Sequence, residues 1–155
     1  MEKLFSLLAC LFITTGFFSI AAAQQKPAPA YKLNEIRVVP FERQTGEFEA
    51  AIPATGDAGS FFNDISKNYL VMVEVSGPAD SFEPTRKIEI VVMEGKKVRA
   101  KMLETIDLFN SDGKVYMPLW INSPLCSEVN ITARIIGQKT PSTLKRKLTV
   151  FQCGE

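Results

Sequence analysis

The chain of 155 residues contains no histidine, and this limits the chemistry that its side chains can do. Histidine is the usual general base near neutral pH, a common metal ligand and the usual partner of a serine or cysteine nucleophile. Acid–base catalysis would therefore need paired carboxylates, as in a glycosidase. Glu74 and Glu89 are the candidates, because both fall within predicted strands. Such residues mostly form ion pairs with neighbouring Lys or Arg, so the sequence favours a protein that is not an enzyme and uses no cofactor.

A group of polar residues at Asp107, Asn110, Asp112 and Gly113 invites comparison with a calcium-binding loop. Calcium loops of the helix-loop-helix type place oxygen ligands at alternate positions before a glycine, and that pattern would require Leu108 to be a ligand. Leucine has no oxygen to offer from its side chain. We therefore predict a turn stabilised by its Asn and Asp side chains, and no metal site.

Aromatic residues are candidates for ligand binding, because flat rings can stack on sugars while nearby polar groups hold hydroxyl groups. Tyr116 and Trp120 are four residues apart and share one face of a predicted strand, with Pro118 between them. Phe61 and Phe62 lie near the middle of a long predicted loop. Packing in the core is the expected role of Tyr116 and Trp120, since aromatic side chains are mostly buried.

Basic residues gather in two groups, one on a single strand and one in the last two strands. An anionic partner, such as a lipid head group or an acidic polysaccharide, would suit them. Rows of this kind more often prevent a strand edge from pairing with other chains. The residues are Lys97, Arg99, Lys101, Arg134, Lys145, Arg146 and Lys147.

The first 23 residues predict export. Residues 1–3 carry charge, residues 4–23 carry none, and three alanines precede Gln24, as in a secretory signal with a small-residue cleavage site. An uncleaved membrane anchor and a lipoprotein signal at Leu7-Leu8-Ala9-Cys10 are the alternatives, but Cys10 stands too early in the uncharged run. We expect a secreted or periplasmic protein that begins at Gln24 and has no stable membrane anchor.

The remaining chain is large enough for one domain. Removal of residues 1–23 from the 155-residue chain leaves 132 residues, which we divide into a short linker at 24–30 and a domain at 31–155. Without Glu2 and Lys3, the 18 basic and 17 acidic residues become 17 and 16, so no excess of positive charge favours nucleic acid. A protein or an envelope glycan is the expected partner.

Alternation of apolar and polar residues recurs from Tyr31 onward, and no stretch sustains a helical period. We predict an all-β domain, an antiparallel sandwich of seven to eight strands that resembles immunoglobulin-like or fibronectin-type domains in architecture. Loops are expected at 53–68, with one helical turn at 60–66, and at 77–84. Pro40 and Pro53 should end strands, the strand at 98–102 should lie at an edge, and the strand at 114–121 should lie at an edge or carry a bulge at Pro118. The predicted strands are 33–39, 47–52, 69–75, 87–93, 98–102, 114–121, 128–137 and 142–152.

The last two strands predict a hairpin with its turn at 138–141 and a defined register. This register joins apolar residues on one face, namely Ile135 with Leu144, Ile131 with Leu148 and Val129 with Val150. It also places Cys126 opposite Cys153 on the other face. Because export leads to an oxidising compartment, we expect these two cysteines to form a disulfide. Sandwich topology further predicts that the strand at 87–93 lies beside this hairpin, with Glu89 facing Arg134 and Lys145.

These observations favour an exported, non-catalytic binding or structural module. A carbohydrate-binding module that uses Tyr116 and Trp120 is the alternative, and a small hydrolase that depends on Glu74 and Glu89 is the third. Asn130-Ile131-Thr132 is a formal glycosylation site, which has meaning only in a eukaryotic secretory route.

We predict that export is followed by cleavage between Ala23 and Gln24. The intact mass of the exported protein should correspond to a chain that begins at Gln24, and two thiols should appear only after reduction. A mass that retains residues 1–23, or that includes a diacylglyceryl group on Cys10, would contradict the prediction.

Overall fold

The computed structural model describes residues 28–54, 62–63, 66–122, 124–148 and 152–153, and these contain strands and no helix. The strands are β1 (Lys32–Glu42), β2 (Glu47–Phe48), β3 (Phe62–Asn63), β4 (Lys67–Ser76), β5 (Ser81–Glu94), β6 (Lys97–Leu108), β7 (Lys114–Ile121), β8 (Val129–Ile136), β9 (Ser142–Leu148) and β10 (Gln152–Cys153). The predicted all-β class is confirmed.

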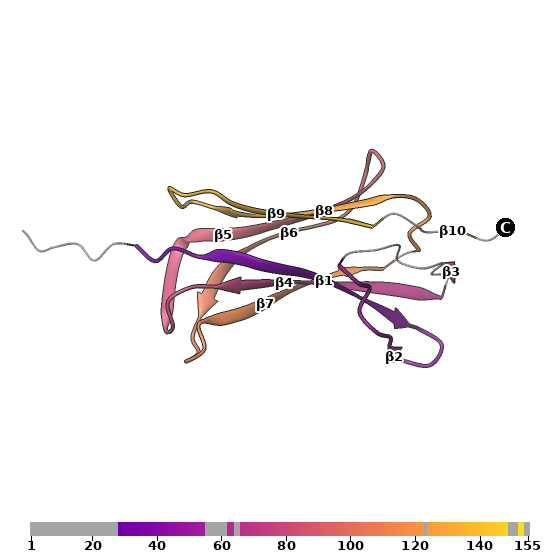
Figure 1. Ribbon diagram of the computed structural model, residues 1–155, viewed down its shortest axis with the longest axis horizontal. Helices are drawn as coiled ribbons and strands as arrows, with labels where there is room; N and C mark the ends of the chain where they lie inside the picture. Colours follow the sequence, from indigo (N-terminus) through magenta and orange to yellow (C-terminus); the bar gives the residue numbers. More distant parts are fainter. Residues whose placement is uncertain (1–27, 55–61, 64–65, 123, 149–151, 154–155) are drawn as a thin grey trace, which may run out of the picture.

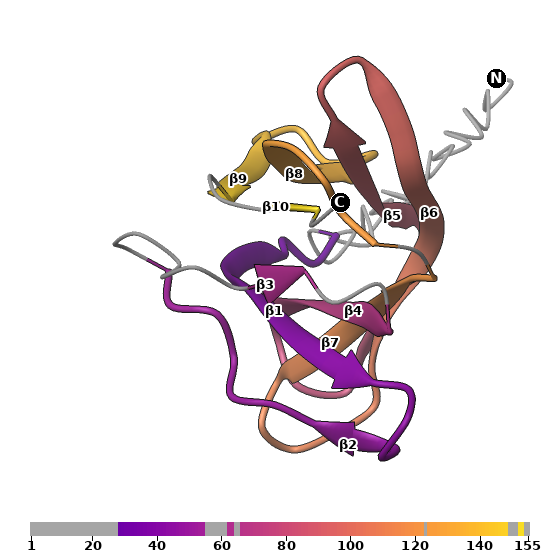
Figure 2. The same cartoon turned by 90° about the vertical axis from the view of Figure 1, so that its right-hand side faces the viewer.

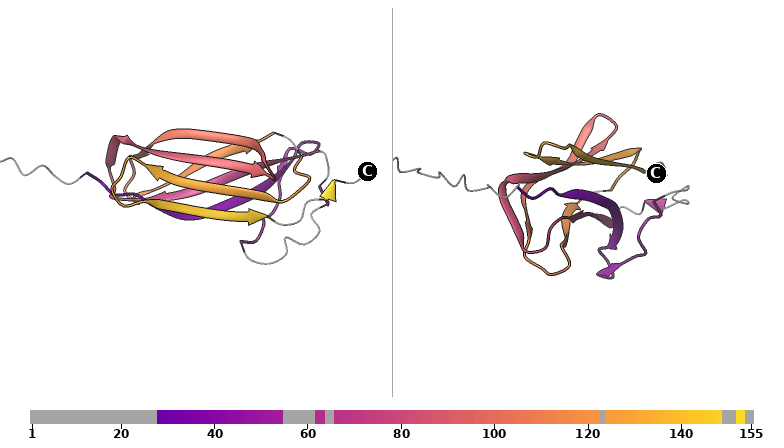
Figure 3. Two further views of the ribbon diagram at one scale, coloured as in Figure 1. Left: turned by 90° about the horizontal axis from the view of Figure 1, so that it is seen from above. Right: turned by 60° about the vertical axis from the view of Figure 1, so that its left-hand side comes forward.

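Two antiparallel sheets of four strands form a sandwich-like structure (Figure 1). The first sheet has the order β2-β1-β4-β7, and the second has the order β6-β5-β8-β9. Seen from above, the strands of both sheets run along the same long direction (Figure 3). As predicted, β6 and β7 are edge strands and β5 lies beside the C-terminal hairpin.

The core lies between the two sheets and is built by alternate residues of each strand. Val71, Val73 and Val75 of β4 are fully buried, as are Ile88 and Ile90 of β5. Each such side chain contributes about 1.5–3 kcal/mol by leaving water. Viewed end-on, the second sheet covers one face of the first, while β6 runs down one side of the molecule toward β7 (Figure 2).

The free edge of β1 is held by side chains of the β8–β9 hairpin, which belongs to the opposite sheet. The Gln138 side chain accepts from the Tyr31 N–H (3.1 Å) and donates to the Tyr31 carbonyl (3.0 Å). Ser142 Oγ accepts from the Leu33 N–H at 3.2 Å. These three backbone groups therefore find their partners across the sandwich, where no neighbouring strand is present.

Arg146 completes this set of contacts from the core face of β9. Its guanidinium donates to the carbonyl oxygens of Ile36 (2.6 Å), Ile52 (2.6 Å) and Pro53 (2.9 Å). The residue is buried, and burial lowers the pKa of the guanidinium, although an arginine stays protonated in proteins. Arg146 therefore does not belong to the basic surface of Lys145 and Lys147.

On the opposite side of the sandwich, a second arginine, Arg99, connects separate segments of the chain. Arg99 of β6 forms an ion pair with Glu94 (3.2 Å) and donates to the carbonyl of Pro124 at 2.8 Å. Glu94 in turn accepts hydrogen bonds from the N–H groups of Cys126 and Ser127. This network fastens the connection between β7 and β8 to the β5–β6 hairpin.

The hairpin of β8 and β9 forms, but its predicted register is wrong by two residues. Val129 pairs with Leu148, Ile131 with Arg146, and Ala133 with Leu144. The turn is longer than predicted, because Gly137 adopts a left-handed conformation (φ 87°) and Gln138 is engaged with Tyr31. A shift of two leaves every side chain on its predicted face, so the alternation alone did not distinguish the two registers.

The new register removes the argument that placed Cys126 opposite Cys153. The backbone of β10, which contains Cys153, pairs in parallel with β3. The side chain of Cys153 lies outside the described part of the chain, so the disulfide stays a prediction.

Four predicted boundaries also differ from the structure. Pro40 lies within β1 instead of ending it, because its missing N–H would point to the free edge, where its carbonyl accepts from Glu49. The strand expected at 47–52 is only β2, although Ile52 still donates to the Val38 carbonyl. Residues 62–63 form β3, within the segment expected to form a helical turn. β5 begins at Ser81, inside the loop expected at 77–84.

We predict that Arg146→Met destabilises the protein by about 2–4 kcal/mol in urea unfolding, because the buried carbonyl oxygens of Ile36 and Ile52 and the partly buried one of Pro53 lose their donor. Lys147→Met, on the exposed face of the same strand, is the matched control and should cause a much smaller loss. Equal losses in the two variants would show that the contacts of Arg146 do not hold β1 in place.

Candidate functional site

The outer face of the first sheet carries an exposed aromatic cluster, formed by Phe41, Phe48 and Trp120. The ring centroids of Phe41 and Phe48 are 5.0 Å apart, and that of Trp120 lies 5.7 Å from Phe41 and 5.9 Å from Phe48. Phe48 is 54% exposed and Trp120 is 41% exposed. Large apolar side chains that gather on a surface mark sites of interaction, whereas isolated ones do not.

Local sequence explains how the three rings meet. β1 returns as β2 through a turn at residues 43–46, in which Gly46 takes a positive φ of 75°. The turn pairs Phe41 directly with Phe48. Trp120 comes from β7, where it pairs with Leu70 of β4, and its ring lies edge-on to Phe41 at an interplanar angle of 83°. The contacts among the rings preorganise this aromatic cluster.

Tyr116 lies on the same face of β7 and is 47% exposed. The prediction that Tyr116 and Trp120 share a strand face is confirmed, but the expectation that they pack in the core is wrong. Met117 and Ile121, on the other face of β7, supply its core contacts. Among the described residues no further layer covers the outer face of this sheet.

A polar network surrounds Tyr116. Its hydroxyl donates to Glu74 at 2.8 Å, and Arg37 lies 5.9 Å from the centroid of its ring. Glu74 also accepts from the Asn34 amide at 2.9 Å and pairs with Lys114 at 3.3 Å. The hydrogen bonds from Asn34 and then Tyr116 are the main reasons that the pKa of Glu74 lies below its ordinary value.

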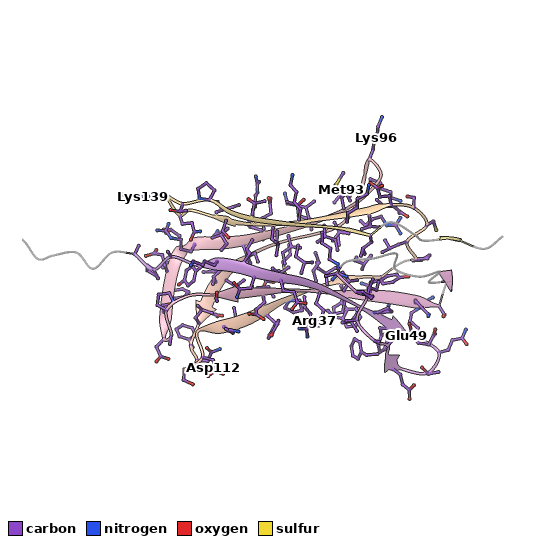
Figure 4. The ribbon with its side chains drawn as sticks, in the orientation of Figure 1. Arg37, Glu49, Met93, Lys96, Asp112 and Lys139 are labelled. Atoms are coloured by element: carbon purple, nitrogen blue, oxygen red, sulfur yellow. The ribbon has the colours of Figure 1, made fainter. Side chains whose placement is uncertain are left out.

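Glu89 stands on the outer face of the second sheet, between Lys101 (3.0 Å) and Arg134. The hydrogen bonds from Lys101 and then Arg134 lower its pKa. Its predicted pairing with Arg134 is confirmed, whereas its second ion-pair partner is Lys101 and not Lys145, and Glu89 is buried. Figure 4 shows the two outer faces, with Arg37 beneath one sheet and Met93 above the other.

The positions of Glu74 and Glu89 bear directly on the hydrolase alternative. The two carboxylates stand on opposite outer faces, so the whole core separates them and they do not face one cleft. A glycosidase also needs one carboxyl group with a raised pKa, whereas both of these are lowered. This pair is therefore not the catalytic dyad of a glycosidase.

The predicted basic residues do not form one continuous surface. Lys101 and Arg134 are engaged with Glu89, and Lys147 pairs with Glu128 at 2.6 Å. Arg99 belongs to the network with Glu94 and the Pro124 carbonyl, while Lys97 and Lys145 are exposed.

The two segments predicted as loops, at 53–68 and 77–84, contribute elements that lie at opposite ends of the molecule. β3, from the long segment after Pro53, is at one end of the molecule, and the β4–β5 connection is at the other (Figure 1). Phe61 and the side chain of Phe62 lie outside the described part of the chain.

The sequence pattern did not predict two of the aromatic contacts at the surface. Phe41 and Phe48 flank a turn, and reading residues 43–46 as a hairpin would have placed them opposite each other. Phe82 and Phe109, which stack with centroids 5.8 Å apart, come from distant segments, and no local pattern joins them.

No protein-family model matches the chain, and a search of curated proteins finds no significant relative. Within the described ranges, no group of three Asp, Glu or Cys side chains is placed to hold a metal ion. The same part of the chain contains no helix that is long and apolar enough to cross a membrane.

We predict that acid destabilises the protein through Glu74. Because its pKa in the folded state is depressed, its stabilising effect is present above the ordinary value of 4.5 and is lost as the pH falls through the lower folded value. The melting temperature should fall less steeply with acidification in Glu74→Gln than in the unmodified protein. Glu104→Gln, an exposed control, should keep the original slope; a steep slope retained in Glu74→Gln would contradict the prediction.

Proposed function

We propose that this protein is an exported, non-catalytic binding domain and that the aromatic cluster of Phe41, Phe48 and Trp120 is the centre of its binding surface. The exposure of Trp120 and Phe48 beside each other is the observation that carries the proposal. Burying an exposed aromatic cluster against a partner yields a large hydrophobic gain, and the packed rings lose little conformational entropy.

The partner we favour is another protein of the cell envelope or the extracellular space. Tryptophan and arginine are enriched among the residues that dominate protein–protein affinity, and such residues sit at the centre of a polar rim. Here the rim is supplied by Arg37 and Glu74 on one side and by the ion pair of Lys67 with Glu49 (2.6 Å) on another. Two phenylalanines in the cluster favour an apolar protein surface over a sugar.

The strand order supports an immunoglobulin- or fibronectin-like frame. In those domains strands A, B and E form one sheet, and strands G, F and C form the other, which can be extended by C′. The order β1-β4-β7 facing β9-β8-β5-β6 has the same sequence of connections. The proposal includes secretion or periplasmic export, signal removal before Gln24, and a disulfide between Cys126 and Cys153.

A carbohydrate-binding module is the second candidate. Tyr116 and Trp120 are exposed on one face with Pro118 between them, and Asn34 and Glu74 offer polar groups beside Tyr116. A sugar ligand would lie along β7, whereas a protein partner would be centred on the aromatic cluster. The two candidates therefore differ in the residues that they use.

Site-specific photo-crosslinking separates these alternatives. A photoreactive phenylalanine analogue at position 48 should capture a defined envelope protein, and excess untagged protein should compete with the capture. The same analogue at Met93, on the opposite outer face, is the control and should capture nothing specific. An untagged Phe48→Ser competitor should be at least tenfold weaker, since a hot-spot aromatic contributes at least about 2 kcal/mol.

Tryptophan fluorescence tests the carbohydrate-binding alternative, because Trp120 is the only tryptophan in the chain. If envelope polysaccharide shifts the emission of Trp120 and position 48 captures no protein, the carbohydrate-binding module replaces the favoured proposal. If position 48 and position 93 capture the same products, the aromatic cluster is not the binding surface.

A further inference from the structure

A pocket of about 740 Å³ opens at the end of the molecule, away from the aromatic cluster. Its walls come from residues 28–30, from the β4–β5 connection, from the start of β5 and from the β8–β9 turn. Lys139, on this turn, marks the position of the pocket in Figure 4. The volume is within the range of roughly 300–1,000 Å³ that is usual for small-molecule sites.

An irregularity in β5 forms one wall of the pocket. Phe82 pairs with Asp107 and Lys87 pairs with Thr105, so residues 83–86 oppose Ile106 alone. Bulges of this kind redirect side chains and are frequent beside binding sites. Here Glu83 and Arg86 line the pocket as a result.

Specific contacts hold the walls in place. Gly137 brings the β8–β9 turn so close to the bulge that a Cβ atom at this position would lie 2.0 Å from the Thr85 carbonyl oxygen. Gln138, which lines the pocket, is fixed by its hydrogen bonds to Tyr31 and Thr140. Ser81 Oγ donates to the Pro78 carbonyl at 2.5 Å and shapes the β4–β5 connection.

Arg86 is the unsatisfied group in this otherwise bonded site. Its Nε atom is buried, and no acceptor among the described residues reaches it. The carboxylate of Glu83 is instead held by the N–H and hydroxyl of Thr85, at 3.2 and 2.8 Å. Because Arg86 as a whole is only partly buried and lines the pocket, the rest of its guanidinium is available to a bound acceptor, which would supply the hydrogen bonds that the chain does not. Lys139 lines the same pocket and forms no ion pair with the described residues.

The pocket also has an exposed aromatic wall. Phe82 lines it, is 50% exposed and stacks on Phe109, which is 71% exposed. Asp80, at the adjoining connection, takes a left-handed conformation with φ 49°, which is uncommon for a residue other than glycine. Non-glycine residues in such conformations cluster at ligand sites.

We propose that this pocket binds a small organic carboxylate, with the carboxylate accepting from Arg86 and the apolar part of the ligand resting on Phe82. The planar guanidinium matches a carboxylate in a paired geometry. Asp80 and Glu83 disfavour a second negative charge, so a ligand with one carboxylate and an apolar body fits better than a polyanion.

Titration of the isotope-labelled protein with 4-phenylbutyrate, followed by amide and arginine Nε–H signals, tests this proposal. Phenylbutyrate should shift the signals of Arg86, Phe82 and Thr140 and should bind at least tenfold more tightly than either 4-phenylbutanol or inorganic phosphate. The alcohol lacks the charge, and phosphate lacks the apolar body. Equal binding of either one, or shifts that are not confined to the pocket, would overturn the proposal.

Variants extend the test. Arg86→Gln should weaken phenylbutyrate binding at least tenfold, as expected from the loss of charge-assisted hydrogen bonds. Lys87→Gln, the adjacent and exposed residue that does not line the pocket, should leave binding unchanged. Phe82→Ser keeps Arg86 in place and should weaken phenylbutyrate binding but not phosphate binding. Binding that survives both Arg86→Gln and Phe82→Ser would overturn the proposal.

Discussion

The free edge of β1 is the point on which the two-sheet structure depends, because no strand of its own sheet pairs with the first half of β1 on that side. Its backbone groups are bonded instead by Gln138, Ser142 and Arg146, which stand four residues apart along the β8–β9 hairpin. Hydrophobic burial between the sheets is not directional, so it alone would not fix how one sheet is placed on the other. The side-chain contacts supply that direction.

This closure also determines which surfaces remain available. With both sides of the sandwich fastened, by Arg146 on one and by Arg99 on the other, the described residues leave two outer faces and two ends. The outer face of the second sheet is largely charged, and its central carboxylate, Glu89, is paired. The outer face of the first sheet instead carries the aromatic cluster of Phe41, Phe48 and Trp120. The asymmetry between the two faces is what makes the aromatic cluster a candidate for binding.

The sequence correctly predicted on which face of its strand a side chain lies, but not whether that face is buried or exposed, and both outcomes have one physical reason. Alternation assigns a residue to one of two sides of a strand, as it did for Met117 and Ile121 against Tyr116 and Trp120, but it does not reveal whether a second layer covers each side. The hairpin register failed in a related way, because a shift of two preserves every face. Tertiary contacts of Gln138 and Gly137 decided the register, and these involve residues more than 50 positions away. The pocket at the end of the molecule could not be predicted from sequence either, since it joins three separate segments, 28–30, 78–86 and 138–140.

Two arginines show how the same chemical group serves structure in one place and suggests recognition in another. Arg146 is buried and Arg86 is partly buried, and each has a buried Nε atom that lacks a partner among the described residues. Arg146 nevertheless directs three hydrogen bonds to carbonyl oxygens of β1 and the segment that follows β2, so its position is explained by the fold. Arg86 has no such bonds among the described residues, although the walls around it are held by glycine, glutamine and serine contacts. The buried Nε of Arg86 cannot recover a hydrogen bond from water, so leaving this donor without a partner costs free energy. The cost is understandable if the partner of Arg86 arrives from outside the chain.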